Sequence, residues 1–330
     1  MTKIALIGDL HFGVKNFDID FLNASLDALE KMAEVLKKEN VTTIYQLGDM
    51  FDNRITMDLN CLYVLKNRFS NIFKDFEFYT FVGNHDMYFK YNRSVTSCDL
   101  FKDLLNIKVI SEPTYHQFGN YTIGISPWLV DNEQLLTDCD ILLGHGDIKG
   151  SKFDMYNVNE NGIELDKTKY KKVYMGHYHY RDGIYLGTPY QINFKEFGSV
   201  PGIIILDENL NETFIENVWS ARHFYISIYK DKVILQYTDK KEEFKGKLPD
   251  YCKIGKIKVI EENSKTDKIV EFLCSISNIV KVDYQVESKG IELDESNEKV
   301  MESFDFINNF IENTGDEKLI EIFKTLFENK

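Results

Sequence analysis

One local pattern, which occurs five times, constrains the fold more than any other feature of this 330-residue chain. In each case an apolar run leads into a glycine, and Asp, Asn or His follows the glycine at once. The instances are Leu6-Ile7-Gly8-Asp9, Gln46-Leu47-Gly48-Asp49, Phe81-Val82-Gly83-Asn84-His85-Asp86, Leu142-Leu143-Gly144-His145 and Tyr174-Met175-Gly176-His177. Apolar runs of this length predict buried strands, and glycine permits a tight turn with no side chain in the way. We therefore expect the strands to end at the same edge of a sheet, with the next side chains pointing into the crevice there.

The intervening segments predict helices, so strands and helices alternate in the first part of the chain. Apolar residues recur at helical spacing over Leu22–Leu36 and over Leu62–Ile72. Between and after them lie strand-like runs at Ile4–Ile7, Ile44–Leu47 and Phe78–Val82. This alternation predicts an α/β layered domain up to about residue 215.

The residues at the strand ends form a mixed set of oxygen and nitrogen donors. The set comprises Asp9, His11, Asp49, Asn84, His145, His177 and His179. Such a set without cysteine suits Mn²⁺, Fe or Zn²⁺ better than Ca²⁺ or Mg²⁺ alone. It is too large for one catalytic ion with an open position, so we expect two ions about 3.5–4 Å apart. In strand-like geometry, Asp9 and His11 share a face, as do His177 and His179, so each pair is expected to hold one site.

The distribution of histidines supports a shared site. Of the seven histidines, five lie within these motifs: His11, His85, His145, His177 and His179. A single histidine after glycine is more often an ordinary turn residue, but structural placement would not concentrate so many of them. His116 and His223 lie outside the motifs and are predicted to be structural, and Trp128 is predicted to pack in the core.

The motifs together resemble the complete motif set of calcineurin-like metallophosphoesterases. The matching segments are Asp9-Leu10-His11, Gly48-Asp49-Met50-Phe51-Asp52, Gly83-Asn84-His85-Asp86, Gly144-His145 and Gly176-His177-Tyr178-His179. Within that superfamily the chain resembles the Mre11/SbcD nuclease branch, which includes the nuclease subunits of T4-type phage recombination complexes. This second step rests on the segments at 48–52 and 83–86, on Leu186-Gly187-Thr188-Pro189-Tyr190-Gln191, and on the layout of the C-terminal region.

The resemblance implies an α/β fold, a β-sandwich flanked by helices, with a small α+β cap domain and a C-terminal helical tail. It implies two divalent ions, with Mn²⁺ the best candidate. Asp9, His11, Asp49 and His179 would hold the first ion, and Asp49, Asn84, His145 and His177 would hold the second. His85 would contact the phosphate and protonate the leaving oxygen, and Asp52 would orient His85. The implied activity is DNA exo- and endonuclease cleavage in recombination, repair or end processing.

The resemblance and the change of pattern along the chain divide it into four parts. Residues 1–221 form the metallophosphoesterase domain, 222–287 the cap, 288–299 a polar linker and 300–330 a helical partner-binding motif. The cap region contains a basic cluster, Lys245, Lys247, Lys253, Lys256 and Lys258, as a candidate DNA contact. An edge strand kept from aggregation by its lysines explains this cluster equally well.

Two short amphipathic helices are predicted after the linker. Their apolar positions include Phe304, Ile307, Ile311, Leu319, Phe323 and Leu326. Two such helices cannot bury these faces on each other completely, so they either dock back on the body or bind a partner. The resemblance implies an ABC-type ATPase of the Rad50/SbcC kind, with a homodimer of this chain inside a heterotetramer.

The net charge of −14, from 39 basic and 53 acidic residues, counts against a DNA substrate. It favours the alternative, a phosphatase or small-molecule phosphodiesterase of the same superfamily. Against a protein phosphatase, Asn53 follows Asp52 and Asp86 follows His85, where those enzymes carry Arg and Glu. A non-enzymatic scaffold is disfavoured because every ligand position is filled.

The cysteine count and the lack of long apolar runs bear on where the chain acts. Its five cysteines show no metal-ligand spacing, and no run approaches the ~20 apolar residues of a membrane helix. We therefore expect reduced thiols, no membrane partner and a cytoplasmic location, which would be the host cytoplasm if a phage encodes the chain.

Overall fold

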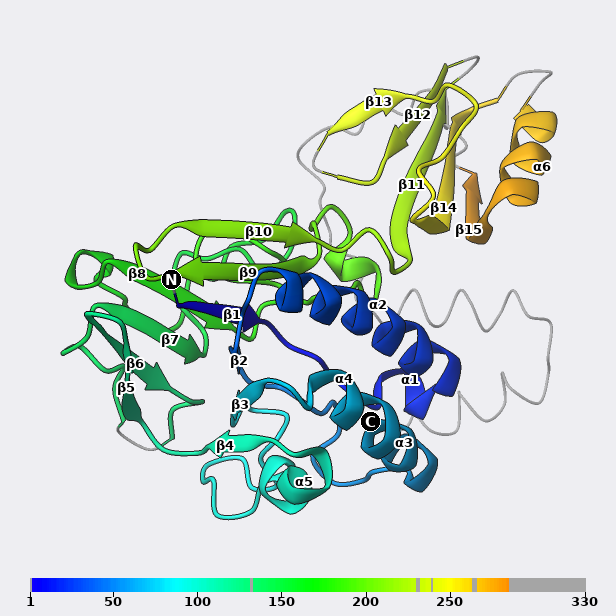
Figure 1. Cartoon of the computed structure of the whole chain (residues 1–330). Coiled ribbons are helices and arrows are strands. Elements are labelled where there is room, and N and C mark those ends of the chain that lie inside the picture. Colours follow the sequence, from blue (N-terminus) through cyan, green and yellow to red (C-terminus); the bar gives the residue numbers. More distant parts are fainter. Residues whose placement is uncertain (1, 131–132, 230–231, 239, 263–265, 285–330) are drawn as a thin grey trace, which may run out of the picture. The chain divides into compact units, whose positions relative to one another are not determined.

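The computed structural model describes residues 2–130, 133–229, 232–238, 240–262 and 266–284 (Figure 1). The chain divides into two units, 1–285 and 286–330. The predicted linker at 288–299 and the predicted partner-binding helices at 300–330 lie outside the described residues. The expectations for Phe304, Ile307, Ile311, Leu319, Phe323 and Leu326 therefore stay predictions.

The first sheet is built on the N-terminal strand, with the order β10-β9-β1-β2-β3-β4. Its strands are β1 (Lys3–Ile7), β2 (Thr43–Gln46), β3 (Glu77–Phe81), β4 (Lys108–Ile110), β9 (Gly202–Asp207) and β10 (Glu212–Glu216). β1 to β4 pair in parallel, while β9 pairs antiparallel with both β1 and β10. The parallel strands therefore carry their carboxyl ends to one edge, as the apolar runs predict.

A second sheet, in the order β5-β6-β7-β8, packs against the first. It contains β5 (Thr114–Phe118), β6 (Tyr121–Ser126), β7 (Ile141–His145) and β8 (Lys172–Gly176). Side chains of both sheets meet in one apolar cluster, for example Leu6 and Phe81 with Ile125 and Leu143, all fully buried. Burying both inner faces in this way gives a β-sandwich.

Helices cover the other face of the first sheet (Figure 1). They are α1 (Val14–Phe17), α2 (Ile19–Lys38), α3 (Leu59–Val64), a π-helical turn η1 (Leu65–Phe69), α4 (Ser70–Phe73) and α5 (Ser97–Leu105). The α2 helix begins after Asp18, whose carboxylate accepts hydrogen bonds from the main-chain N–H groups of Asp20 and Phe21. Its predicted apolar stripe, including Leu26 and Leu29, is buried against the sheet. The predicted fold class, a helix-flanked β-sandwich, is confirmed.

The five strand-end motifs do not all belong to one sheet. The motifs of β1, β2 and β3 lie on the first sheet, and those of β7 and β8 lie on the second. The expectation of a single sheet edge is therefore wrong. An apolar run specifies a buried strand but does not specify its neighbour, so the sequence could not assign strands to sheets.

Residues 222–284 form a separate five-stranded sheet with the order β13-β12-β11-β14-β15. It contains β11 (Arg222–Tyr229), β12 (Lys232–Gln236), β13 (Lys241–Glu243), β14 (Cys252–Glu261) and β15 (Asn278–Tyr284), with α6 (Thr266–Ile276). One face buries its own apolar cluster, which includes Phe224, Ile257 and Leu273.

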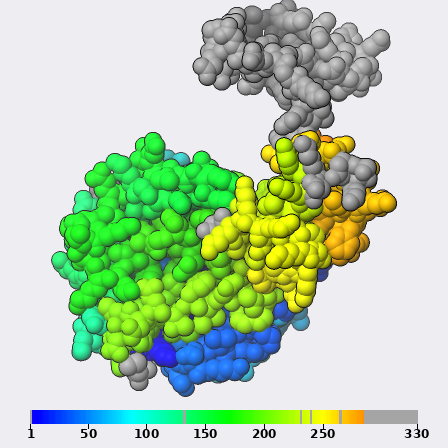
Figure 2. All heavy atoms as spheres, turned by 90° about the horizontal axis from the view of Figure 1, so that it is seen from above, coloured from blue at the N-terminus to red at the C-terminus, as the bar shows by residue number. Residues whose placement is uncertain are grey.

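This sheet contacts the segment that follows β8. The main-chain N–H of His223 donates to Gln191 Oε1 over 2.7 Å, and Gly198 forms a bridge with Thr238. The yellow residues of the sheet meet the green residues of the sandwich at the surface (Figure 2). The remaining short elements are η2 (Lys167–Lys169) and η3 (Phe194–Glu196). In the described part of the chain, no helix combines the length and the apolarity needed to cross a membrane.

Candidate metal centre

Three of the predicted ligands occupy backbone conformations that L-amino acids rarely adopt. The φ angles are 46° at His11, 51° at Asp49 and 101° at His177. Such conformations cost free energy and persist only where the surrounding structure holds them in place. The strand-end turns therefore fix the direction of these side chains at the expense of local strain, as is typical of functional sites.

The glycines of the motifs leave room for these side chains. A Cβ on Gly83 would collide with the Asp49 carboxylate, and one on Gly48 would collide with the His145 ring. A Cβ on Gly176 would lie 2.8 Å from Asp9 Oδ1 and 2.9 Å from His145 Nδ1. Each glycine is required because the main chain or a side chain of another motif approaches its backbone, a contact that the sequence pattern alone did not reveal.

Asp9, His11 and His179 form the first group of ligand atoms, all within 4.8 Å of one another. His11 Nε2 lies 2.8 Å from His179 Nε2, and His179 Nε2 lies 3.8 Å from Asp9 Oδ2. Asp9 and His11 are almost fully buried. Two imidazole nitrogens and a carboxylate oxygen that converge in this way form a suitable donor set for a divalent transition-metal ion.

Asp49, His145 and His177 form a second group within the same distance limit. The side-chain oxygen of Asn84 lies 3.1 Å from His145 Nε2 and 2.9 Å from His177 Nδ1. Asp49 connects the two groups, because its Oδ2 lies 3.4 Å from His145 Nε2 and 3.7 Å from His11 Nε2. One carboxylate oxygen therefore lies between histidines of both groups.

Hydrogen bonds at the far side of each ring direct the remaining nitrogen toward these groups. His145 Nδ1 lies 2.6 Å from the Leu47 carbonyl oxygen, and His179 Nδ1 lies 2.9 Å from Glu196 Oε1. Because a carbonyl only accepts and a carboxylate accepts when ionised, each Nδ1 donates, which leaves Nε2 free to bind a metal. The donor set and its tautomers thus fit divalent metal ions.

Asp49 and its neighbour His145 shift each other's pKa values. Burial favours the neutral form of Asp49, but His145, His11 and His85 outweigh it and lower the pKa of this carboxylate. Burial likewise lowers the pKa of His145, but the Asp49 carboxylate outweighs it and raises the pKa of His145 to about 9. A divalent ion would replace these protons as the positive charge beside Asp49.

His85 lies next to these groups but faces them differently. Its Nδ1 donates to the main-chain carbonyl of Asp52 over 2.7 Å, and its main-chain N–H donates to Asp49 Oδ1 over 2.8 Å. The ring packs edge-on against that of His11, with centroids 4.9 Å apart. Asp52 therefore contacts His85 through its main chain, while its carboxylate lies 3.3 Å from His11 Nδ1. The carbonyl fixes the tautomer of His85 and leaves Nε2 available.

Comparison with known proteins identifies the family. The family model for calcineurin-like phosphoesterases matches residues 2–181. The chain belongs to the calcineurin-like phosphoesterase family. This phosphoesterase is also similar to exonuclease subunit 1 of Enterobacteria phage T4, with 27% identity over 318 residues, covering 88% of this chain and 87% of that protein. The predicted family and enzyme class, a hydrolase acting on phosphodiester bonds that uses divalent metal, are confirmed.

The phosphoesterase differs from one detail of the sequence prediction. Asp9 and His11 lie in one group as expected, but His177 and His179 lie in different groups. The expectation that this second pair would hold one site is wrong. Its reason is the φ of 101° at His177, since alternation of side chains applies only to an extended backbone.

Two residues of the phosphoesterase site were missed by the sequence reasoning. Asp147 Oδ1 lies 3.0 Å from His177 Nε2, and Glu196 Oε1 accepts the hydrogen bond from His179 Nδ1. Asp147 is two residues after His145, the same spacing as between Asp9 and His11, and this spacing could have indicated it. No comparable signal indicated Glu196, which is 1% exposed in the turn η3.

Trp128 and Asp86 lie next to the ligand groups, whereas His116 makes its contacts elsewhere. Trp128 borders the site, with its ring centroid 5.1 Å from that of His177, where core packing was expected. The buried carboxylate of Asp86 accepts hydrogen bonds from the main-chain N–H groups of Phe51 and Gly83, each over 3.0 Å, and so holds two of the strand-end motifs together. His116 Nδ1 forms a hydrogen bond with the Tyr45 hydroxyl over 2.9 Å and takes no part in the ligand groups.

The lysines of the cap's basic cluster lie on two neighbouring segments. Lys253, Lys256 and Lys258 lie on β14, while Lys245 and Lys247 are exposed between β13 and β14. A role for these lysines in DNA binding stays a prediction.

Proposed function

We propose that this phosphoesterase is a metal-dependent DNA exo- and endonuclease that acts in recombination, repair or end processing. The observation that best supports the proposal is the position of Asp49 Oδ2 between histidines of both ligand groups. A carboxylate so placed suits a pair of ions that together bind one phosphodiester. The similarity to a protein named exonuclease subunit 1 supports nucleic acid as the substrate.

In this proposal the first ion is held by Asp9, His11, Asp49 and His179, and the second by Asp49, Asn84, His145 and His177. The mixed oxygen and nitrogen donors without cysteine suit Mn²⁺, Fe or Zn²⁺, and of these Mn²⁺ is the ion that we propose. When bound, the ions supply charge neutralisation at the phosphate and activation of water. Glu196 and Asp147 position His179 and His177 by holding their far nitrogens.

His85 is the proposed acid for the leaving group. Because Nδ1 donates to the carbonyl of Asp52, the ring can present Nε2 to a substrate beside the metal groups. A protonated Nε2 would neutralise the departing oxygen, which is the contribution expected of a positioned general acid. Asp52 serves through its main chain in this role and contacts His11 with its side chain.

We further propose that the chain works as the nuclease subunit of a complex in a host cytoplasm. The name of the phage relative contains the word subunit, which favours a partner. The proposed partner is an ABC-type ATPase of the Rad50/SbcC kind, bound by residues 300–330, with two copies of this chain in the complex. Deletion of 288–330 should abolish copurification with such an ATPase and leave metal binding intact.

The central experiment uses an end-labelled linear DNA duplex incubated with the full-length protein and Mn²⁺, with and without EDTA. We expect metal-dependent shortening by the wild type and by His116→Ala, a matched histidine outside the site, but not by His85→Ala. Failure of the wild type to cut any DNA, either alone or with its ATPase, would reject the nuclease.

A small-molecule phosphodiesterase or phosphatase is the second candidate, favoured by the net charge of −14. It predicts rapid turnover of bis-p-nitrophenyl phosphate or p-nitrophenyl phosphate without DNA cleavage. It also predicts that the deletion of 288–330 changes neither activity.

A further inference from the structure

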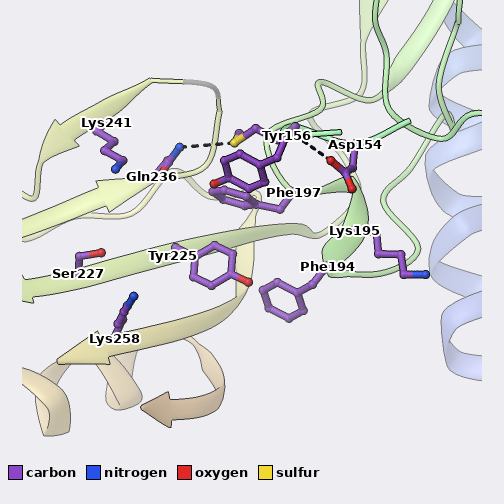
Figure 3. A pocket seen from close by; sticks show the side chains of 11 residues that line it. Asp154, Tyr156, Phe194, Lys195, Phe197, Tyr225, Ser227, Gln236, Lys241 and Lys258 are labelled. Carbon is purple, nitrogen blue, oxygen red and sulfur yellow. Dashed lines mark hydrogen bonds between the residues drawn. The ribbon is translucent and has the colours of Figure 1, made fainter. Parts of the chain in front are cut away.

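A cleft borders the open face of the five-stranded sheet, away from the ligand groups. Its volume is about 400 Å³, and Figure 3 shows the side chains that line it. One wall consists of residues from β11, β12, β13 and β14, and the other consists of the loop at 154–156, the turn η3 and Phe197 after it. A cleft of this size is in the usual range for sites that hold a small organic group.

Aromatic rings form the centre of the cleft. Tyr156, Phe194, Phe197 and Tyr225 lie together there (Figure 3). Phe197 and Tyr225 have centroids 4.5 Å apart, and Phe194 and Tyr225 have centroids 5.6 Å apart. Tyr156 is 78% exposed, a large apolar exposure for a residue at the mouth of a cleft.

Lysines lie at both ends of these rings. Lys241 and Lys258 lie at one end, and Lys195 lies at the other (Figure 3). All three are exposed. Lys195 lies close enough to Asp154, the carboxylate in the lining, to influence it electrostatically. Burial favours the neutral form of Asp154, but hydrogen bonds from Asn157 and Tyr156 and the charge of Lys195 outweigh it and lower its pKa.

The sheet explains why these residues share one face. Tyr225 pairs with Lys256, and Ser227 pairs with Lys258, in the parallel register of β11 and β14. The alternate residues of the same strands, such as Ile226 and Ile257, are buried in the apolar cluster of the sheet. The face opposite that cluster therefore carries tyrosine, serine and lysine side chains side by side.

Both walls continue into residues that hold the metal-site histidines. Phe194 and Lys195 share the turn η3 with Glu196, which accepts the hydrogen bond from His179. The loop of Tyr156 follows β7, the strand that ends at His145, and Asp147 at its start contacts His177. A chain seated in the cleft would thus lie along the segments that position two proposed ligands.

We propose that this cleft binds an unpaired stretch of the nucleic-acid substrate, with bases on Tyr156 and Tyr225 and phosphates on Lys195, Lys241 and Lys258. Aromatic faces between cations are the usual means of binding single strands without regard to sequence. Paired bases are stacked within a duplex and cannot reach such rings. The inference rests on the proposed nuclease function and assigns it a substrate form.

The test measures binding of a fluorescent oligothymidylate of about 16 nucleotides to the full-length protein in EDTA, by anisotropy. We expect Lys241→Ala/Lys258→Ala and Tyr156→Ala each to weaken binding about tenfold. Loss of two phosphate contacts should also reduce the slope of log K against log salt by about 1.4. Affinity for a duplex of the same length should change less.

Matched controls separate the cleft from general charge and from folding. Lys232→Ala/Lys268→Ala removes the same charge from exposed positions of the same sheet and helix outside the cleft. Tyr115→Ala removes an exposed tyrosine on β5. Both controls should bind as the wild type does, and Lys241→Arg/Lys258→Arg should restore binding. Thermal unfolding of each variant checks that it is folded.

The outcomes separate this inference from the proposed function. If the wild type cuts DNA but the cleft variants bind single strands as tightly as the controls, the cleft assignment is overturned and the nuclease stands. If the wild type hydrolyses a small phosphodiester but neither cuts DNA nor binds the oligonucleotide, both are overturned.

Discussion

Exchange of Glu196 for glutamine would separate two opposing effects of this carboxylate on metal binding. Loss of a carboxylate that holds a ligating imidazole weakens metal binding about 10–100-fold. Glu196 also affects the competing proton. Burial lowers the pKa of His179, but the hydrogen bond and charge of Glu196 outweigh it and raise that pKa to about 9. A metal ion must displace this proton.

The size of the proton effect follows from that pKa. A group of pKa about 9 is unprotonated in about one molecule in 300 at pH 6.5 and in about one in four at pH 8.5. If the variant returns His179 to its ordinary pKa of about 6.5, these fractions become about one half and nearly all. The ratio of the variant Kd to the wild-type Kd should therefore rise roughly 40-fold between pH 6.5 and pH 8.5.

Titration of each protein with Mn²⁺, with free Mn²⁺ followed by electron paramagnetic resonance, gives both Kd values at each pH. His145 also has a raised pKa, but its proton competes equally in both proteins and cancels in the ratio. Glu164→Gln, at a carboxylate that is 83% exposed, serves as the control. A ratio that does not change with pH would refute the argument that Glu196 governs the protonation of His179.

Three further predictions test the site and one buried histidine of the cap. His85→Ala should leave the Kd for Mn²⁺ within about twofold, while the rate of DNA cleavage falls about 10²–10⁴-fold, as expected for loss of a general acid. Gly176→Ala should destabilise the protein by more than about 2 kcal/mol in urea unfolding and weaken Mn²⁺ binding, because the new Cβ would overlap the Leu47 carbonyl oxygen and crowd the proposed ligands Asp9 and His145. Gly146→Ala is its control, since the nearest atom to that Cβ is 3.6 Å away. Burial lowers the pKa of His223 to about 4, so the unfolded chain takes up a proton first as the pH falls, and stability is lost from about pH 6.5 to about pH 4. His223→Asn should reduce this acid-dependent loss, and equal losses in both proteins would contradict the assignment.

The sequence predicted the strand-end motifs because their determinants are local. An apolar run, a glycine and a polar residue occupy adjacent positions, so Asp9, Asp49 and His145 could each be located from a few residues. The helical stripe of α2 was predicted for the same reason, since its buried residues recur within one segment.

Features that depend on contacts between distant segments could not be predicted. Glu196 reaches His179 only because the segment after β8 turns back toward the sandwich at η3. The separation of His177 from His179 depends on one backbone angle that tertiary packing imposes. The sequence likewise indicated a basic cluster in the cap but not the aromatic residues that β11 and η3 place beside Lys258.

The division of the proposed ligands between the two sheets has a consequence for stability. Asp9, Asp49 and Asn84 follow strands of the first sheet, whereas His145 and His177 belong to strand ends of the second. Bound ions would link the two sheets, because the sheets could not separate without breaking the bonds between the ions and their ligands. At a free metal concentration 100 times the Kd, one such ion adds about 2.7 kcal/mol to the free energy of unfolding. Chelation would then loosen the protein as well as inactivate it, and the supply of metal in the cell would control its lifetime.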